Sequence, residues 1–316
     1  MFHFDTCLRI TAAHLAIDAR TGQQMGFVSH AHADHMAPHA LTLCTPATAR
    51  LLRHRFGNRR RVQELSYGEP CIVANHRLTA FPAGHMLGSA MLLVEYDGQS
   101  MLYTGDFRLR RSATAEPAEL PRADLLVMES TYGDPRHRFP PREHVVADLV
   151  HTITCTLKAG RIPVIEAYVT GKAQELARLL WDAGIPTQQH PAMASISRLY
   201  LASGCDPGPI HVYDGRHLPG HVILQPPSGQ RRARRLPLPG GCMKIAVTGW
   251  AIDPRYRFRH GLDYAFPLTD HADYDELLEC IQRVQPRKIY CTHGPAGFAE
   301  RLRAMGRDAQ PLQDVP

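Results

Sequence analysis

The stretch Val28-Ser29-His30-Ala31-His32-Ala33-Asp34-His35 places three imidazoles and one carboxylate within six residues, directly after the apolar residues 26–28. Imidazole nitrogens and carboxylate oxygens are ligands that suit Zn²⁺ and Mn²⁺ in proteins. An H-x-H-x-D-H run that leaves a strand can turn its side chains toward two neighbouring metal ions. A polar loop that is merely rich in histidine is the alternative, because the chain has 19 histidines. The fixed positions and the further ligands downstream favour a metal site.

Three later residues are candidate ligands of the same chemical types. His85 lies in a glycine-containing turn between two strand-like runs, Asp106 follows the run 101–105, and His293 follows the apolar run 289–292. Functional side chains are commonly found at such strand ends. Any one of them alone is more often an ordinary loop residue, but together and in this order they indicate one site.

This order of residues resembles the metallo-β-lactamase superfamily, whose fold is an αβ/βα sandwich with a two-metal site at its edge. The resemblance implies two divalent metal ions, Zn or Mn. It implies that one ion is held by His30, His32 and His85 and the other by Asp34, His35 and His293, with Asp106 bridging the two. Asp18, after the strand-like run 15–17, matches the aspartate that supports the ligands through hydrogen bonds.

Length and composition set the general class of protein. The chain has 316 residues, 44% of them hydrophobic, which suffices for two domains or for one domain with a large insertion. The formal charge of +6 favours a polyanionic partner. The eight cysteines include no C-x-x-C pair, which favours reduced thiols in a cytoplasmic protein. We expect no membrane insertion or export, because no apolar run reaches the roughly 18 residues of a membrane span and no signal-peptide pattern opens the chain.

Compact apolar segments separated by turns fill residues 5–134 and predict the sheets of a sandwich. They are residues 8–10, 15–17, 26–29, 40–44, 71–74, 78–81, 90–96, 100–103 and 125–129. One helix is expected at 47–56, with Thr45 as its cap and Pro46 at its first position. Beyond residue 134, helical patterns at 142–159 and 172–183 flank the strand-like run 162–167. This alternation predicts a parallel-sheet domain, and Thr170 is the candidate cap of its second helix.

The long region between Glu129 and the two histidines His271 and His293 resembles the insertion of the β-CASP nuclease branch of the superfamily. Motifs at 82–85, 104–108, 128–134, 171–174 and 249–250 extend the likeness to bacterial ligase-associated DNA exonucleases, relatives of Artemis and Apollo. The resemblance implies an α/β fold in three segments. They are a metallo-β-lactamase domain at 1–134, a β-CASP insertion at 135–265 and a return to the first domain at 266–316.

The resemblance also assigns roles in catalysis and in binding. The catalytic group would be Asp34, Glu129 and His271, with Glu129 orienting the ring of His271 beside the scissile phosphate. The residues expected to contact nucleic acid are Ser130, Thr131, Lys172, Arg108, Arg255 and Arg257. Ser130, Thr131 and Lys172 form a candidate pocket for a 5′-phosphate.

Two basic stretches have a structural and a functional interpretation. Residues 255–260 alternate Arg with Tyr and Phe, which suits stacking on bases and pairing with phosphates, or an exposed strand with one apolar face. A second cluster follows the metal-binding stretch and consists of Arg50, Arg53, Arg55, Arg59, Arg60 and Arg61. It is either a solvated face or a surface that contacts the phosphate backbone.

The predicted activity is a 5′-to-3′ exonuclease on single-stranded DNA that acts in DNA repair. The expected partners are nucleic acid and a DNA ligase or other repair proteins. His293 leaves RNA open as a substrate, because RNA-processing members of the branch have histidine at the matching position, whereas eukaryotic DNA-processing members commonly have valine. The alternatives are a β-CASP ribonuclease and a non-catalytic nucleic-acid-binding scaffold, and the complete ligand set disfavours the scaffold.

Overall fold

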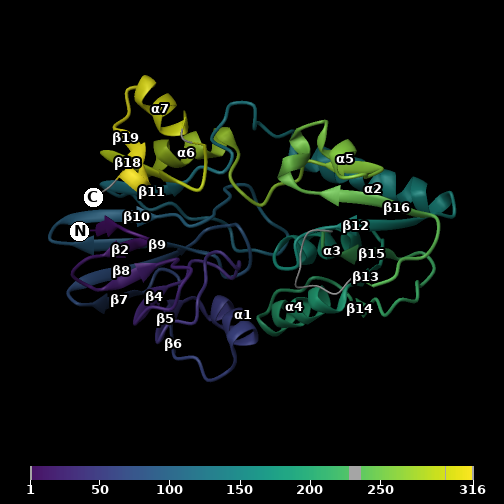
Figure 1. Ribbon diagram of the computed structural model, residues 1–316, viewed down its shortest axis with the longest axis horizontal. Helices are drawn as coiled ribbons and strands as arrows, with labels where there is room; N and C mark the ends of the chain where they lie inside the picture. The colour runs from purple at the N-terminus through teal and green to yellow at the C-terminus, as the bar shows by residue number, and fades with distance from the viewer. Residues whose placement is uncertain (1, 228–235, 296, 315–316) are drawn as a thin grey trace. The chain divides into compact units, whose positions relative to one another are not determined.

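A computed structural model describes residues 2–227, 236–295 and 297–314 of the chain, which forms two compact units (Figure 1). Unit 1 comprises Met1–Arg138 and His271–Pro316, and unit 2 comprises Phe139–Asp270. The sequence places these divisions slightly earlier, at 134 and 265. The connector before Phe139 stays with unit 1, because Arg138 pairs with Asp275 at 2.9 Å and Tyr274 N donates to His137 O at 3.1 Å.

Unit 1 contains two mixed sheets. The first has the strand order β1-β2-β3-β4-β5-β6, antiparallel from β1 to β3 and parallel from β3 to β6. Its strands are β1 (Phe2–Phe4), β2 (Leu8–Ile10), β3 (Leu15–Ile17), β4 (Met25–Phe27), β5 (Leu41–Cys44) and β6 (Val62–Glu64). Helix α1 (Pro46–Phe56) connects β5 to β6.

The second sheet of unit 1 has the order β19-β18-β11-β10-β9-β8-β7, parallel from β19 to β10 and antiparallel from β10 to β7. Its strands are β7 (Pro70–Val73), β8 (His76–Pro82), β9 (Ala90–Tyr96), β10 (Gln99–Tyr103), β11 (Leu125–Glu129), β18 (Lys288–Thr292) and β19 (Ala309–Pro311). The strand β18 pairs with β11, so the C-terminal segment completes the sheet that the first segment begins.

The two sheets pack face to face over a shared core. Phe27 and Leu43 of the first sheet belong to the same buried cluster as Leu92 and Tyr103 of the second. The other face of the second sheet is covered by α6 (Tyr274–Val284) and α7 (Gly297–Ala304), whose apolar residues join a second cluster with that face (Figure 1). Successive residues of a strand therefore contribute side chains to opposite faces of the sheet, as the two-residue repeat of a β-strand requires. The expected metallo-β-lactamase sandwich is confirmed.

Unit 2 is built on a six-stranded parallel sheet with the order β14-β13-β15-β12-β16-β17. Its strands are β12 (Ile162–Glu166), β13 (Thr187–Gln189), β14 (His211–Val212), β15 (Val222–Gln225), β16 (Cys242–Val247) and β17 (Tyr264–Phe266). Its helices are α2 (Arg142–Lys158), α3 (Lys172–Asp182), α4 (Pro191–Ala202), the 3-10 turn η1 (Gly249–Ile252) and α5 (Tyr256–Arg259), while η2 (Leu312–Asp314) closes unit 1. The apolar sides of α2 and α3 pack on the sheet in one cluster.

Local signals in the sequence predict several of these elements closely. Thr45 caps α1 through its side chain and Pro46 occupies the first turn, as expected. The cap predicted at Thr170 is wrong, because α3 begins after Gly171, whose N–H donates to Gln174 Oε1. The strand interpretation of residues 255–260 is also wrong, since Tyr256–Arg259 form α5 and Arg255 and His260 flank it. None of the helices in the described ranges has both the length and the apolar character needed to cross a bilayer.

Candidate metal centre and active site

Residues 28–35, which contain the candidate ligands, follow β4 and contact both sheets of unit 1. Val28 N donates to Leu43 O at 2.9 Å, and Ala90 N of β9 donates to Ser29 O at 2.8 Å, so the first part of the loop is fixed by both sheets. His30 is fully buried and His35 is 2% exposed, whereas the Asp34 side chain is 57% exposed. The loop thus presents buried imidazoles below and an open carboxylate at the rim.

His85 is held by a dense set of backbone contacts in its own loop. Ser89 Oγ accepts from the N–H groups of His85 and Met86, both at 3.2 Å. Gly84 has φ +77°, and a Cβ there would lie 2.1 Å from the carbonyl oxygen of Arg108. Only glycine combines this left-handed backbone with so close an approach. The backbone position from which the His85 side chain extends is therefore well fixed.

Helix α1 and two further side chains lock the far end of the same loop. The hydroxyls of Thr45 and Thr48 donate to Gly88 O at 2.6 and 2.9 Å. The carboxylate of Glu116 accepts from Gly88 N at 3.0 Å. The role of Glu116 was not predicted, because it lies in an irregular segment without a recognisable motif.

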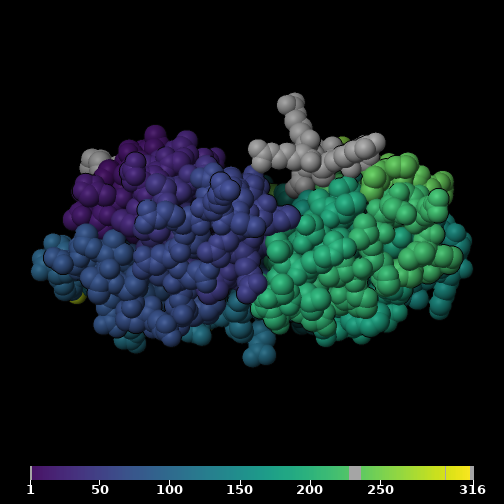
Figure 2. Space-filling view, turned by 90° about the horizontal axis from the view of Figure 1, so that it is seen from below, coloured from purple at the N-terminus to yellow at the C-terminus, as the bar shows by residue number. Residues whose placement is uncertain are grey.

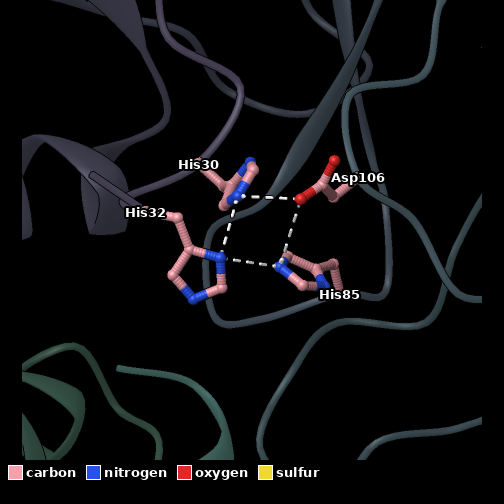
Figure 3. Close-up of side chains that lie close together, drawn as sticks. All are labelled: His30, His32, His85 and Asp106. Carbon is pink, nitrogen blue, oxygen red and sulfur yellow. Dashed lines mark hydrogen bonds and ion pairs between the residues drawn. The ribbon is translucent and has the colours of Figure 1, made fainter. Parts of the chain in front are cut away.

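Four ligand-type side chains converge on one point (Figure 3). His30 Nε2 and His85 Nε2 each lie 3.1 Å from His32 Nδ1, and His30 Nε2 lies 3.4 Å from Asp106 Oδ2. These four ligand atoms all lie within 4.8 Å of one another. A bound cation would satisfy their lone pairs together, which single protons shared between imidazoles cannot do. The donor set therefore fits a divalent metal of the Zn or Mn type.

A second group of candidate ligands adjoins the first through Asp106. His35 Nε2 lies 3.4 Å from Asp106 Oδ2 and 3.9 Å from Asp34 Oδ2. The ring of His293 lies 5.0 Å from that of His35, centroid to centroid, and His293 has φ +53°. A left-handed conformation at a non-glycine residue is uncommon and is found at functional sites. The structure brings all seven predicted ligands into one region of unit 1.

Asp18 sets the orientation of two of these rings. Its carboxylate accepts from Ser29 N at 2.8 Å, Ser29 Oγ at 2.5 Å, Tyr103 OH at 2.8 Å and His35 Nδ1 at 2.8 Å. Because the Ser29 hydroxyl donates to Asp18, it accepts from His30 Nδ1, 3.0 Å away. In their neutral forms His30 and His35 therefore both carry the proton on Nδ1, and their Nε2 atoms face Asp106 and the cluster. Ser29 and Tyr103 were not predicted, although both stand beside predicted ligands in the sequence.

His271 and Glu129 form a buried pair at the edge of the cluster. His271 Nδ1 lies 3.1 and 3.0 Å from the two oxygens of Glu129, and its Nε2 lies 3.9 Å from Asp106 Oδ2. Glu129 is 1% exposed and also accepts from Phe107 N at 2.8 Å. Ala272 N donates to Phe107 O, so both partners are tied to the strand end that carries Asp106. The carboxylate orients the imidazole so that its Nε2 faces Asp106.

In the metal-free cluster the pKa values of His30 and His35 shift in opposite directions, so a metal ion would find a neutral ring at His30 and would displace a proton at His35. Burial lowers the pKa of His30 well below its usual value and keeps the ring neutral. Burial also opposes the charged forms of His35 and Asp106, but their mutual attraction dominates: Asp106 and Asp18 raise the pKa of His35 to about 9, and His35 and His271 hold the pKa of Asp106 well below its usual value. Asp106 is therefore a carboxylate that already attracts positive charge.

The residues predicted to contact nucleic acid fall into two groups. Ser130 and Thr131 lie beside His293, and their hydroxyls donate to Thr292 O and His293 O, each at 3.1 Å. Arg108 is also in unit 1 and is 2% exposed.

The others belong to unit 2. Lys172 is 1% exposed, with its ammonium 3.5 Å from Glu175 and 3.7 Å from Asp270. Arg255 and Arg257 are exposed, and the guanidinium of Arg257 lies 4.4 Å from the centre of the Phe258 ring.

Comparisons with known proteins agree with this geometry. Residues 6–165 match the model of the beta-lactamase superfamily domain, and residues 264–311 match that of the Zn-dependent metallo-hydrolase RNA specificity domain. The chain therefore belongs to the metallo-β-lactamase superfamily. Within it, the chain belongs to the β-CASP nuclease branch, a family of metal-dependent nucleases, as its sequence predicted.

Relatives with DNA-related and RNA-related names both match. The chain is 40% identical over 298 residues to "Probable DNA ligase" of Opitutus terrae, which covers 93% of this chain and 29% of that protein. It is 26% identical over 315 residues to "DNA cross-link repair protein SNM1" of Arabidopsis thaliana, covering 89% and 64% of the two chains. It is 32% identical over 148 residues to "Endoribonuclease ysh1" of Aspergillus fumigatus, covering 45% and 16%. The chain thus spans less than two thirds of each of these relatives.

A solved structure shares the fold. It is a protein of unknown function from Enterococcus faecalis, with a TM-score of 0.58 and 17% sequence identity, and the likeness covers 85% of this chain and 75% of that one.

Proposed function

We propose that the protein is a two-metal-dependent DNA exonuclease that digests single-stranded DNA from the 5′ end and acts in DNA repair. One observation carries the proposal: the two ligand groups and the His271–Glu129 pair meet at a single carboxylate, Asp106. A scaffold that only binds nucleic acid has no need of this arrangement.

The ligands and the catalytic pair have distinct tasks in this reaction. His30, His32 and His85 would hold one divalent ion and Asp34, His35 and His293 the other, with Asp106 shared between them. Bound there, the ions supply an activated water nucleophile and neutralise charge on the phosphodiester. Through its Nε2, His271 donates a hydrogen bond to the scissile phosphate or a proton to the leaving oxygen. Glu129 accepts a hydrogen bond from His271 Nδ1 and so keeps the ring in place.

The open side of the site suits a polymeric substrate. Asp34 and His293 are exposed at the rim, while His30 and His85 form a buried floor. A strand can then reach the metal ligands without closure of a deep cavity. In the proposal Ser130 and Thr131 contact the terminal 5′-phosphate, Lys172 also contributes to its recognition, and Arg108, Arg255 and Arg257 contact the strand.

DNA is preferred because the relatives whose matches span most of this chain carry DNA-related names. They are the "Probable DNA ligase" and the "DNA cross-link repair protein SNM1". The match to the ligase covers 29% of that protein, so this chain corresponds to one part of it. From this we infer a DNA ligase as the functional partner.

A β-CASP ribonuclease is the second candidate function. Two observations favour it: the match of residues 264–311 to an RNA specificity domain, and the presence of His293 within that segment. The matches to endoribonucleases, however, span less than half of the chain.

A cleavage assay tests both candidates. Protein stripped with a chelator receives Zn²⁺, Mn²⁺ or Mg²⁺ separately and acts on end-labelled single-stranded DNA and on RNA of matched sequence. The expected result is metal-dependent shortening of DNA from the 5′ end. Preferential cleavage of RNA would refute the DNA exonuclease in favour of the ribonuclease. Products that shorten from the 3′ end would refute the 5′-to-3′ polarity.

The double variant Asp34→Ala, His35→Ala tests the site assignment. It should lose bound metal and cleavage while its thermal unfolding stays cooperative. The matched control is His144→Ala, Asp148→Ala, which removes the same residue types from exposed positions of α2. Wild-type cleavage by the first variant would show that the ligands are wrongly assigned.

The 5′-phosphate pocket is tested by comparing strands that end in 5′-phosphate and 5′-hydroxyl. The rate ratio should favour the phosphate and should fall in Lys172→Gln. That change removes a buried ammonium group from beside Asp270, while Arg142 still pairs with Glu175 at 2.9 Å, so we also expect a loss of about 3 kcal/mol in stability. A ratio measured within one variant does not depend on the folded fraction, so an unchanged ratio would remove Lys172 from the pocket.

A further inference from the structure

The most basic segment of the chain is α1 together with the loop that leads to β6. Residues 46–61 contain six arginines and no aspartate or glutamate. The whole chain has 36 basic and 30 acidic residues, so these six account for its formal net charge of +6. Without them, 30 basic residues face 30 acidic ones. Residues 46–61 are therefore a locally basic segment of unit 1, which favours a polyanionic partner there.

This surface, here called the α1 basic surface, consists of the arginines at 50, 53, 55, 59, 60 and 61. All are exposed except Arg53, which is half-buried and pairs with Glu64 at 2.9 Å. Within the described part of the chain, no side-chain hydrogen bond or ion pair engages the guanidinium groups of Arg50, Arg59 and Arg61. These three cations are available to a ligand. The segment lies along the lower edge of unit 1 in Figure 1 and faces the viewer in Figure 2.

The α1 basic surface begins next to the loop that carries His85. The N-terminal turn of α1 is tied to that loop by the hydroxyls of Thr45 and Thr48, which donate to Gly88 O. From Thr48 to Arg55 the helix rises about 10 Å, at about 1.5 Å per residue. The arginines therefore follow a path that starts at the ligand loop and leads away from it across the outside of unit 1.

We propose that the α1 basic surface binds the phosphate backbone of the nucleic-acid strand on the part that is not being cleaved. The inference rests on the proposed function and adds a contact surface to it. Phosphate groups repeat along a nucleic-acid strand, so several unpaired guanidinium groups on one surface complement their charge. An anionic membrane is the other polyanion to consider. It is disfavoured because the apolar residues Leu51 and Leu52 of α1 are buried, and membrane-surface helices expose such residues.

The test measures binding instead of cleavage. The variant Arg50→Gln, Arg59→Gln, Arg61→Gln is compared with Arg283→Gln, Arg287→Gln, Arg307→Gln, which removes the same charge from exposed positions elsewhere in unit 1. Fluorescence anisotropy records the affinity for a labelled oligothymidine and for a matched oligouridine as a function of salt, with a chelator present to prevent cleavage. Thermal unfolding of each variant verifies that it is folded.

Each phosphate contact contributes about 0.7 to the slope of log K against log salt for a single strand, so three lost contacts should reduce the slope by about 2. The control variant should keep the wild-type slope. An unchanged slope in the first variant would overturn the proposal, as would equal loss in both variants. A loss of binding to phosphatidylserine vesicles with the oligonucleotide slope intact would also overturn it, in favour of a membrane.

The outcome is separable from the nuclease assay. A reduced slope in a protein that fails to cleave DNA or RNA would support the surface while refuting the proposed activity. A wild-type slope in an active nuclease would refute the surface alone.

Discussion

Replacement of Glu129 by glutamine should slow cleavage without removing the metals. Glu129 is 1% exposed and its oxygens lie 3.0 and 3.1 Å from His271 Nδ1, whose side chain is 20% exposed, so water screens the pair only in part. A hydrogen bond to a charged group contributes about 1.5–3 kcal/mol, and a neutral one about 0.5–1.5 kcal/mol. The substitution should therefore cost about 1–2 kcal/mol of transition-state stabilisation, which is a fall in kcat/KM of about 5- to 30-fold.

The assay follows single turnovers on 5′-labelled single-stranded DNA at saturating Mn²⁺, with bound metal measured in parallel. Glutamine still accepts from Phe107 N, which Glu129 contacts at 2.8 Å, so unfolding should change little. Glu129→Ala should show a further loss of stability, because the amide of Phe107 and the ring of His271 then lose a buried partner. A Glu129→Gln rate within twofold of wild type would refute the orienting role, and loss of metal together with activity would make Glu129 a ligand.

Three further predictions concern the ligands and their supports. His293→Ala should lower the cleavage rate about 10- to 100-fold or more through weaker metal binding, with little change in the ratio of DNA to RNA cleavage, and a shift from RNA toward DNA would make this position a reader of the substrate. Gly84→Ala should lower the free energy of unfolding by about 3 kcal/mol or more, because at φ +77° the added methyl group would lie 2.1 Å from Arg108 O. The control Gly98→Ala, at φ +70° with nothing within 4 Å, should lower it by only about 1–2 kcal/mol. Equal losses for the two variants in chemical denaturation would contradict this account. In the metal-free protein His35 has a folded pKa of about 9 against 6.5 for a free histidine, so its contribution to stability is complete below pH 6.5 and is lost as the pH rises toward 9. Across this range the free energy of unfolding of the wild type should fall more steeply than that of His35→Gln. Parallel curves for the two proteins would contradict this expectation.

The sequence by itself predicted the candidate ligands, because the chemistry of metal binding resides in residue types and their order. His30, His32, Asp34 and His35 stand in a spacing that few other functions require, and the later ligands each follow an apolar strand. The positions of strands and helices such as β2 and α1 could also be predicted from the sequence, since hydrophobic periodicity and helix capping are local properties. The pairing of β18 with β11, which brings His293 to the site, was accessible only through the family resemblance.

The tertiary structure alone decided how these groups act together. The role of Asp18 in fixing two tautomers depends on Ser29 and Tyr103, and Tyr103 approaches from the other sheet. Likewise, Glu116 contacts Gly88 from a segment with no regular pattern. Lys172, which looks like a free cation at a helix start in the sequence, is buried between Glu175 and Asp270. Residue order specifies which groups are available, whereas hydrogen-bond partners and burial depend on contacts between distant segments, and these exist only in the folded chain.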